Sequence, residues 1–171
     1  YTIVYNAKQD GYTIGGFDSA FATESLLTQL EFDLNRFTYL VRLMLTTRVL
    51  VTAKNGFAGW AEMLKAARTK ELKWGVGAFG RALHVDSILV KEEVGIPARF
   101  IAWGGTAEAM NAMMRGDISV AMVSEDSVQG LIKAGEIRVL AQFSEKSSYP
   151  GIPSIKDLGY PDLAEKLGGH R

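Results

Sequence analysis

Three glycines with the spacing G-x-G-x-x-G (Gly75, Gly77 and Gly80) make up the stretch best suited to binding a charged ligand. They lie in the segment KWGVGAFGRALHVD, after an apolar strand-like run and before a helical one. Glycines in such a turn leave backbone N–H groups exposed at the positive end of the helix, where an anion is stabilised. Arg81 adds a guanidinium that can hold a carboxylate through two hydrogen bonds. The chemistry predicted here is anion binding.

Two further turns have related chemistry. One is a second glycine turn ahead of a helix, and the other follows a third strand-like run with polar residues; they comprise Trp103, Gly104, Gly105, Thr106, Ser124 and Glu125. The carboxyl ends of parallel strands meet at one edge of an open α/β sheet, where small ligands bind. Short-turn geometry is a sufficient explanation for any single loop, but three aligned loops favour a ligand-binding edge.

The same glycine pattern is also the fingerprint of proteins that bind a nicotinamide dinucleotide. In those proteins it follows the first strand, and an acidic residue near the end of the second strand binds the ribose. Here the motif begins only at Gly75, and the next strand ends at Trp103 followed by two glycines. Glu108 lies too late, inside the following helix. The missing acid disfavours an NAD-dependent dehydrogenase.

Alternating strands and helices position these turns. Apolar residues at three- and four-residue spacing predict helices over 60–67 and 83–94, between Thr106 and Gly116, and in a short segment closing at Gly135. Strand-like runs lie at 72–76, 98–103, 118–123 and 137–143. The alternation predicts an α/β fold with a parallel sheet and right-handed crossovers. Residues 11–48 add a strand-like YTIGGF and a helical SAFATESLLTQL.

Composition bounds the function classes. Lys plus Arg and Asp plus Glu both number 19, and a net charge of zero provides no field to attract nucleic acid or an anionic membrane. There is no cysteine, hence no thiol nucleophile, and the two histidines, His84 and His170, lack metal-ligand spacing. His84 stands four residues from Ile88, on the expected buried face of its helix, which predicts a structural histidine. Enzymatic chemistry is disfavoured.

One group of charged residues carries no functional prediction. Arg36, Arg42 and Arg48 recur every six residues, a period that matches neither a helix nor a strand. We expect them to be solvated.

The ordered set of motifs resembles the tripartite tricarboxylate transporter substrate-binding proteins, also called Bug receptors. The segments that carry this resemblance are NAKQDGYTIG, LKWGVGAFGRALHVDSILV, FIAWGGTAEAMNAMMRGDISVAMV, LIKAGEIRVLAQFSEK and YPGIPSIKDLGYPDL. They occur in the family's order through almost the whole chain. Gln9 stands where the family usually has proline, and Arg81 replaces a small hydroxyl residue. Trp103 and Gly104 replace tyrosine and lysine.

The resemblance implies a type II periplasmic-binding-protein architecture, in which two α/β lobes close on a small carboxylate without catalysis or a cofactor. It also implies an extracytoplasmic location, although no signal peptide is visible, and delivery of the ligand to a membrane permease. Family members are longer, so we expect truncation at both ends. Residues 1–50 would be part of the first lobe, 51–143 the second lobe with hinge crossings at 51–54 and 141–144, and 144–171 the return to the first lobe. The first-lobe pieces are expected to pair with a second copy.

This mapping places the ligand contacts in the three turns and just past the YTIGGF segment. The expected contacts are Asp18, Ser19, Gly77, Ala78, Phe79, Gly80, Arg81, Trp103, Gly104, Gly105, Thr106, Ser124 and Glu125. Phe79 and Trp103 would suit an aromatic or hydrophobic ligand body. Arg81 either pairs with a second ligand carboxylate or narrows the pocket, and both alternatives stay open. The competing function is a cytoplasmic effector domain of a transcription regulator, which can share this fold.

Overall fold

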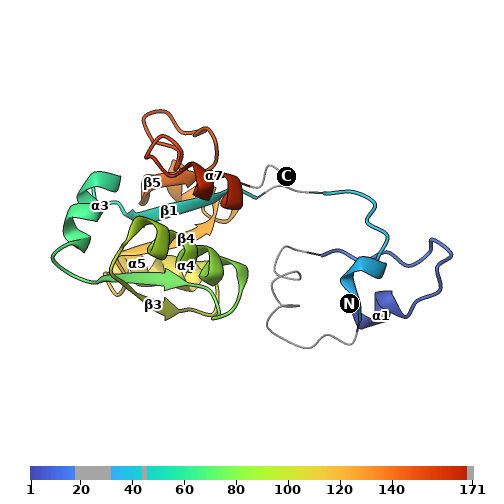
Figure 1. Ribbon diagram of the computed structural model, residues 1–171. Coiled ribbons are helices and arrows are strands. Elements are labelled where there is room, and N and C mark those ends of the chain that lie inside the picture. Colours follow the sequence, from blue (N-terminus) through green and yellow to red (C-terminus); the bar gives the residue numbers. More distant parts are fainter. Residues whose placement is uncertain (18–31, 44–45, 169–171) are drawn as a thin grey trace.

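A five-stranded sheet forms the core of residues 46–168 in the computed structural model (Figure 1), which describes residues 1–17, 32–43 and 46–168. The strands stand in the order β3-β2-β4-β1-β5. Their bounds are β1 Arg48–Ala53, β2 Leu72–Val76, β3 Ala98–Ala102, β4 Val120–Ser124 and β5 Ile137–Phe143. The four strand-like runs of the sequence are therefore confirmed as β2 to β5, and β1 is the fifth strand.

Helices join the strands, as the apolar spacing predicts. The helices of the sheet domain are α3 Trp60–Ala67, α4 Ala82–Val94, α5 Thr106–Arg115, the 3-10 helix η2 Glu125–Ser127, α6 Gln129–Lys133 and α7 Pro161–Leu167. The N-terminal segment holds α1 Thr2–Tyr5 and the 3-10 turn η1 Leu34–Arg36, outside the sheet (Figure 1). α4 and α5 end at Gly95 and Gly116, whose φ angles of 72° and 85° lie in the left-handed region that favours glycine.

The sheet is mixed, so the expectation of a wholly parallel sheet is wrong for one strand. β2 pairs in parallel with both β3 and β4, whereas β1 runs antiparallel to β4 and to β5. The three strands that precede the predicted ligand turns therefore point the same way and end at one edge. Because β1 is reversed, its first residue, Arg48, also lies at that edge and pairs in register with Ser124.

Alternating side chains divide the core between the two faces of the sheet. Leu50 of β1 and Met122 of β4 belong to the cluster that packs against α3, α4 and α7. Their neighbours Val49 and Val123 belong to the cluster that packs against α5 and α6. This alternation is the period of two expected of a strand covered on both faces. The sheet is thus buried between two helical layers, and its edges hold the loops.

The apolar face predicted for α4 is confirmed at Leu83 and Val94, which pack against the core, and is wrong at Ile88 and Leu89. Its buried residues are Ser87 and Val90, while Ile88 and Leu89 are 37% and 38% exposed. The Ser87 hydroxyl donates to the carbonyl of Leu83, which satisfies it inside the helix. α4 therefore rests on the sheet along a narrow polar and apolar strip rather than along a broad apolar face.

The segment before β1 differs from the secondary structure expected from the sequence, whereas the segment after β5 packs into the core of the sheet domain. YTIGGF forms no strand: Tyr12 donates its amide to the Asp10 carboxylate in a turn, and Tyr12 and Ile14 are exposed. The segment SAFATESLLTQL, expected to be helical, lies wholly outside the described part of the chain. After β5, Ile155 and α7 enter the same core as the sheet, with Tyr160 against Trp60. The division into lobes at residues 50 and 144 stays a prediction about a longer protein.

Candidate ligand-binding edge

Two of the three motif glycines are explained by backbone geometry. A Cβ on Gly75 would overlap Cδ1 of the buried Ile118, so a side chain there requires Ile118 to shift within the core. Gly80 has a φ of 80°, in the left-handed region. A Cβ on Gly77, in contrast, would meet nothing within 4 Å. Packing and turn geometry therefore account for Gly75 and Gly80, and Gly77 is left as the glycine with open space around it.

His84 holds the loop after β2 in place. Its Nδ1 accepts a hydrogen bond from the Gly80 amide at 3.0 Å, and its ring contacts Phe79 and Phe100 with centroids 4.9 and 5.3 Å away. Burial lowers the pKa of His84 below its usual value. These contacts confirm the prediction of a structural histidine, although the ring is only partly buried and Ile88, four residues further on, is exposed.

In the second turn, which follows β3, a glutamate of the next helix accepts a backbone hydrogen bond. Gly104 donates its amide to Glu108 Oε2 at 3.0 Å, which caps the start of α5. Trp103 packs against the cluster on the α5 side of the sheet, and its buried Nε1 has no hydrogen-bond partner among the residues described. Phe79 contacts His84 on α4 and is 61% exposed, so the two aromatic residues expected to form one wall pack against different neighbours.

In the third turn, after β4, the side chains of Ser124 and Glu125 hydrogen-bond to other protein side chains. Ser124 Oγ accepts from Arg48 Nη1 at 2.8 Å. Glu125 accepts from the Tyr149 hydroxyl at 2.9 Å through Oε1 and from Gln142 Nε2 at 2.8 Å through Oε2. These bonds tie the end of β4 to β5 and to the segment after it. Burial and the Glu125 carboxylate raise the pKa of Tyr149 to about 12.

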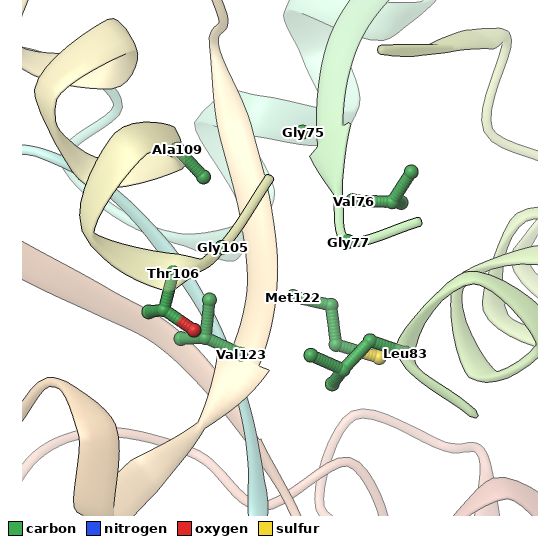
Figure 2. A pocket seen from close by; sticks show the side chains of 9 residues that line it. All are labelled: Gly75, Val76, Gly77, Leu83, Gly105, Thr106, Ala109, Met122 and Val123. Carbon is green, nitrogen blue, oxygen red and sulfur yellow. The ribbon is translucent and has the colours of Figure 1, made fainter. Parts of the chain in front are cut away.

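A small cavity lies where the turns converge (Figure 2). Its volume is about 20 Å³, enough for about one water molecule. The lining residues come from β2, β4, α4 and α5; they are Gly75, Val76, Gly77, Leu83, Gly105, Thr106, Ala109, Met122 and Val123. Figure 2 shows Leu83 facing Met122, and Thr106 beside Val123. Of the predicted ligand contacts, the structure gathers Gly77, Gly105 and Thr106 around this space.

The remaining predicted contacts have varied surroundings. Ala78, Phe79 and Arg81 are exposed on the loop after β2. Asp18 and Ser19 lie outside the residues that the structure describes.

Sequence reasoning missed a polar group at this edge. Arg48, expected to be solvated, has its side chain only 14% exposed and donates through Nε to Asp86 Oδ2 on α4 at 3.0 Å. Burial raises the pKa of Asp86, and the Arg48 guanidinium opposes that rise. The one signal in the sequence was the position of Arg48 directly before the apolar run VLV.

Within residues 1–17, 32–43 and 46–168, His, Asp and Glu side chains form no group of three or more that could hold a metal ion. Among the helices described, none has the length and apolar character needed to span a bilayer.

Comparison with known proteins identifies the family. The family model of the tripartite tricarboxylate transporter family receptor matches residues 2–167. BugT of Bordetella pertussis is 26% identical over 99 residues, which are 57% of this chain and 30% of BugT. The chain belongs to this family of solute-binding receptors, which are not enzymes.

Solved structures show the same fold over part of their length. A ligand-free TctC solute-binding protein from Polaromonas superposes with a TM-score of 0.70 at 21% identity, over 81% of this chain and 48% of that protein. MatC of Rhodopseudomonas palustris with bound malate also gives 0.70, at 16% identity, over 83% and 50%. R. palustris Rpa4515 with adipate gives 0.63 at 24% identity, over 68% and 41%. The chain thus spans about half the length of these periplasmic-type binding proteins or less.

Proposed function

We propose that this chain forms part of an extracytoplasmic receptor that captures a small carboxylate and delivers it to the membrane permease of a tripartite transporter. Its family membership supports the transport role, and the malate of MatC and the adipate of Rpa4515 support the ligand class. One observation carries the proposal. The turns after β2 and β3, and the end of β4, meet at one sheet edge, where Gly77, Gly105 and Thr106 border a cavity.

Within this edge, we assign the ligand carboxylate to the turn after β2. At the start of α5, Glu108 already accepts the Gly104 amide and places a negative charge there. At the start of α4 the corresponding acceptor is the neutral ring of His84, and Arg81 stands at the helix N-cap. An anion is favoured at a helix N-terminus that no acidic side chain has neutralised. Gly77, Ala78 and Arg81 are therefore the proposed primary contacts.

The other proposed contact residues hold the ligand body or shape the edge. Phe79 is exposed and available to cover an apolar ligand body, while Gly105 and Thr106 border the cavity. Ser124 is held by Arg48, and both oxygens of Glu125 already accept protein hydrogen bonds. We propose that these two shape the edge and join the ligand contacts when the lobes close. Asp18 and Ser19 are proposed to contribute from the first lobe.

Lobe closure is the proposed mechanism. Residues 51–143 would form the second lobe, with the segments before residue 51 and after residue 143 belonging to the first, and the chain would bend at the two crossings between them. Ligand contacts from both lobes would stabilise the closed state over the open one. In the absence of the rest of the first lobe, its segments in this chain would associate with a second copy.

The proposal is tested by thermal unfolding of the full-length receptor with mono-, di- and tricarboxylates, aromatic acids and NAD. A ligand at a hundredfold excess over its dissociation constant stabilises by about 2.7 kcal/mol and raises Tm by several degrees. We expect a shift with one carboxylate class. A shift with NAD alone, or no shift with any carboxylate, contradicts the proposal.

A matched pair of variants tests the assigned turn. Arg81→Ser should weaken carboxylate binding by on the order of tenfold, because it removes a charge-assisted hydrogen bond. Arg99→Ser removes an exposed arginine from the edge strand β3 and should leave the affinity unchanged. Equal affinities for the two variants would move the carboxylate away from Arg81.

A further inference from the structure

Three helices of the sheet domain begin with the same side-chain contact. In each, the third residue of the helix accepts a hydrogen bond from the amide of the residue that precedes the N-cap. Glu62 Oε2 accepts from Ala58 at 2.5 Å in α3, and Glu108 Oε2 accepts from Gly104 at 3.0 Å in α5. His84 Nδ1 accepts from Gly80 at 3.0 Å in α4. The contact fixes the direction in which the chain enters the helix.

The acceptor differs in charge between these helices. Glu62 and Glu108 are carboxylates, whereas His84 accepts through a ring nitrogen. A histidine that accepts at Nδ1 carries its proton on Nε2 and is neutral. The ring lies against Phe79 and Phe100, and its partial burial lowers the pKa of His84, which favours the neutral form. α4 is therefore capped without an added negative charge, in contrast to α3 and α5.

The contact also selects which amides of the loop remain for a ligand. The amide of Gly80 donates to His84 Nδ1, and the amide of Arg81 donates to the carbonyl of Ala78. For the amides of Ala78 and Phe79, the structure gives no acceptor within the described residues. Gly80 thus shapes the loop through its left-handed φ and its bond to His84, and the amides of Ala78 and Phe79 are available to a ligand beside Gly77.

We propose that His84 is a positioning residue for ligand binding: it locks the loop of residues 77–81 through Gly80 and Phe79 while keeping that loop free of negative charge, so that the loop can accept a carboxylate. This role rests on the proposed carboxylate function. A glutamate at this position would hold Gly80 equally well. It would also set an anion beside the bound carboxylate, and like charges at close range disfavour each other.

The experiment uses the full-length receptor and three variants at residue 84. His84→Gln keeps a neutral acceptor, His84→Glu supplies a charged one, and His84→Ala removes the acceptor. Hydrogen exchange of the Gly80 amide reports the positioning, and calorimetric titration with malate and with adipate at low salt reports the binding. Glu62→Gln is the matched control, because α3 follows β1, whose carboxyl end lies at the opposite edge of the sheet.

The expected results separate shape from charge. His84→Gln should retain Gly80 protection and bind within about threefold of the wild type, since its side-chain oxygen replaces Nδ1. His84→Glu should retain protection but bind at least about tenfold more weakly, through repulsion of the ligand carboxylate. His84→Ala should lose protection and bind more weakly, and Glu62→Gln should bind like the wild type.

Two outcomes would overturn the proposal. Unchanged Gly80 exchange in His84→Ala would show that His84 does not hold the loop. Equal affinity of His84→Glu and His84→Gln would show that the absence of charge does not matter. If the wild type binds no carboxylate, the carboxylate function fails and the charge part of this proposal fails with it. The exchange data would still decide the positioning of the loop, because they require no ligand.

Discussion

Arg48, the first residue of β1, donates from Nε to Asp86 Oδ2 on α4 at 3.0 Å, and its Nη1 reaches Ser124 at the end of β4. One guanidinium thus joins a helix and two strands at the edge where the ligand turns lie. The two side chains of the ion pair are only 14% and 17% exposed. Removing one partner of such a buried pair destabilises the fold, because the other charge is then left buried and unpaired.

Arg48→Ala should lower the free energy of unfolding by on the order of 2 kcal/mol, somewhat below the ~3–5 kcal/mol typical of fully buried pairs. Urea unfolding of Arg48→Ala, Asp86→Ala and the double variant measures the coupling. Arg115→Ala is the matched control, since its pair with Asp117 is exposed and such pairs are worth about 0–1 kcal/mol. Equal losses for Arg48→Ala and Arg115→Ala would contradict a buried role for the pair.

The protonation of Asp86 gives a prediction with a definite sign. Burial raises its pKa above the usual 3.8 and outweighs the hydrogen bond and charge of Arg48. A group with a raised folded-state pKa contributes stability that is fully present below the unfolded pKa and is lost as pH rises through the folded pKa. NMR titration of the Asp86 carboxyl should give a raised pKa in the wild type and a higher one in Arg48→Ala. A pKa at or below 3.8 in the wild type would refute this.

Gly75→Ala should destabilise the protein by about 1–3 kcal/mol, because the new methyl overlaps Ile118 and the core must shift to admit it. Gly77→Ala should change the stability by no more than about 0.5 kcal/mol, because its methyl enters open space. Adding Ile118→Val, which deletes the overlapping Cδ1, should recover part of the loss in Gly75→Ala. Urea unfolding of the wild type and the three variants measures these differences, and equal stability of Gly75→Ala and Gly77→Ala would show that packing does not require Gly75.

Tyr149 should ionise later than ordinary tyrosines. Its pKa of about 12 arises from burial first and from the Glu125 carboxylate second. The associated stability is present below the unfolded pKa near 10 and is lost as pH rises to about 12. Ultraviolet titration should show a late phenolate that is absent in Tyr149→Phe and shifts to lower pH in Glu125→Gln. Titration of Tyr149 together with the other tyrosines would contradict its contact with Glu125.

The elements of the sheet domain were predictable because residues close together in the sequence determine each of them. The spacing of Trp60, Met63 and Ala67 marks α3, and Gly95 and Gly116 mark the ends of α4 and α5. The direction of β1 was not predictable, because an apolar run such as VLV reads the same in a parallel and an antiparallel strand. The buried strip of α4 was missed since it depends on which helix and strand residues meet it, and those lie far away in the sequence.

The candidate site was predictable as a set of turns but not as a set of contacts. The motif located the loop after β2, while three-dimensional packing decided that Gly75 serves the core and Gly80 the turn. The partners of Arg48 lie 38 and 76 residues away, so its position before the apolar run VLV was the one local sign of its burial. The capping roles of Glu108 and His84 follow a recognisable spacing from the helix start, and could have been inferred.

The reversed strand β1 has a consequence for how this region is joined to a larger protein. Arg48 and Phe143 are register partners on adjacent strands, so the stretch between them leaves the sheet beside the point where it entered. Segments whose two ends adjoin can be inserted into a host chain at a single position with little disturbance. Residues 48–143 carry all three turns of the ligand edge, but Ile155 and α7 pack into the same core, and Tyr149 holds Glu125 of the third turn. We therefore expect that transferring this edge between relatives requires the segment through α7 to be exchanged together with residues 48–143.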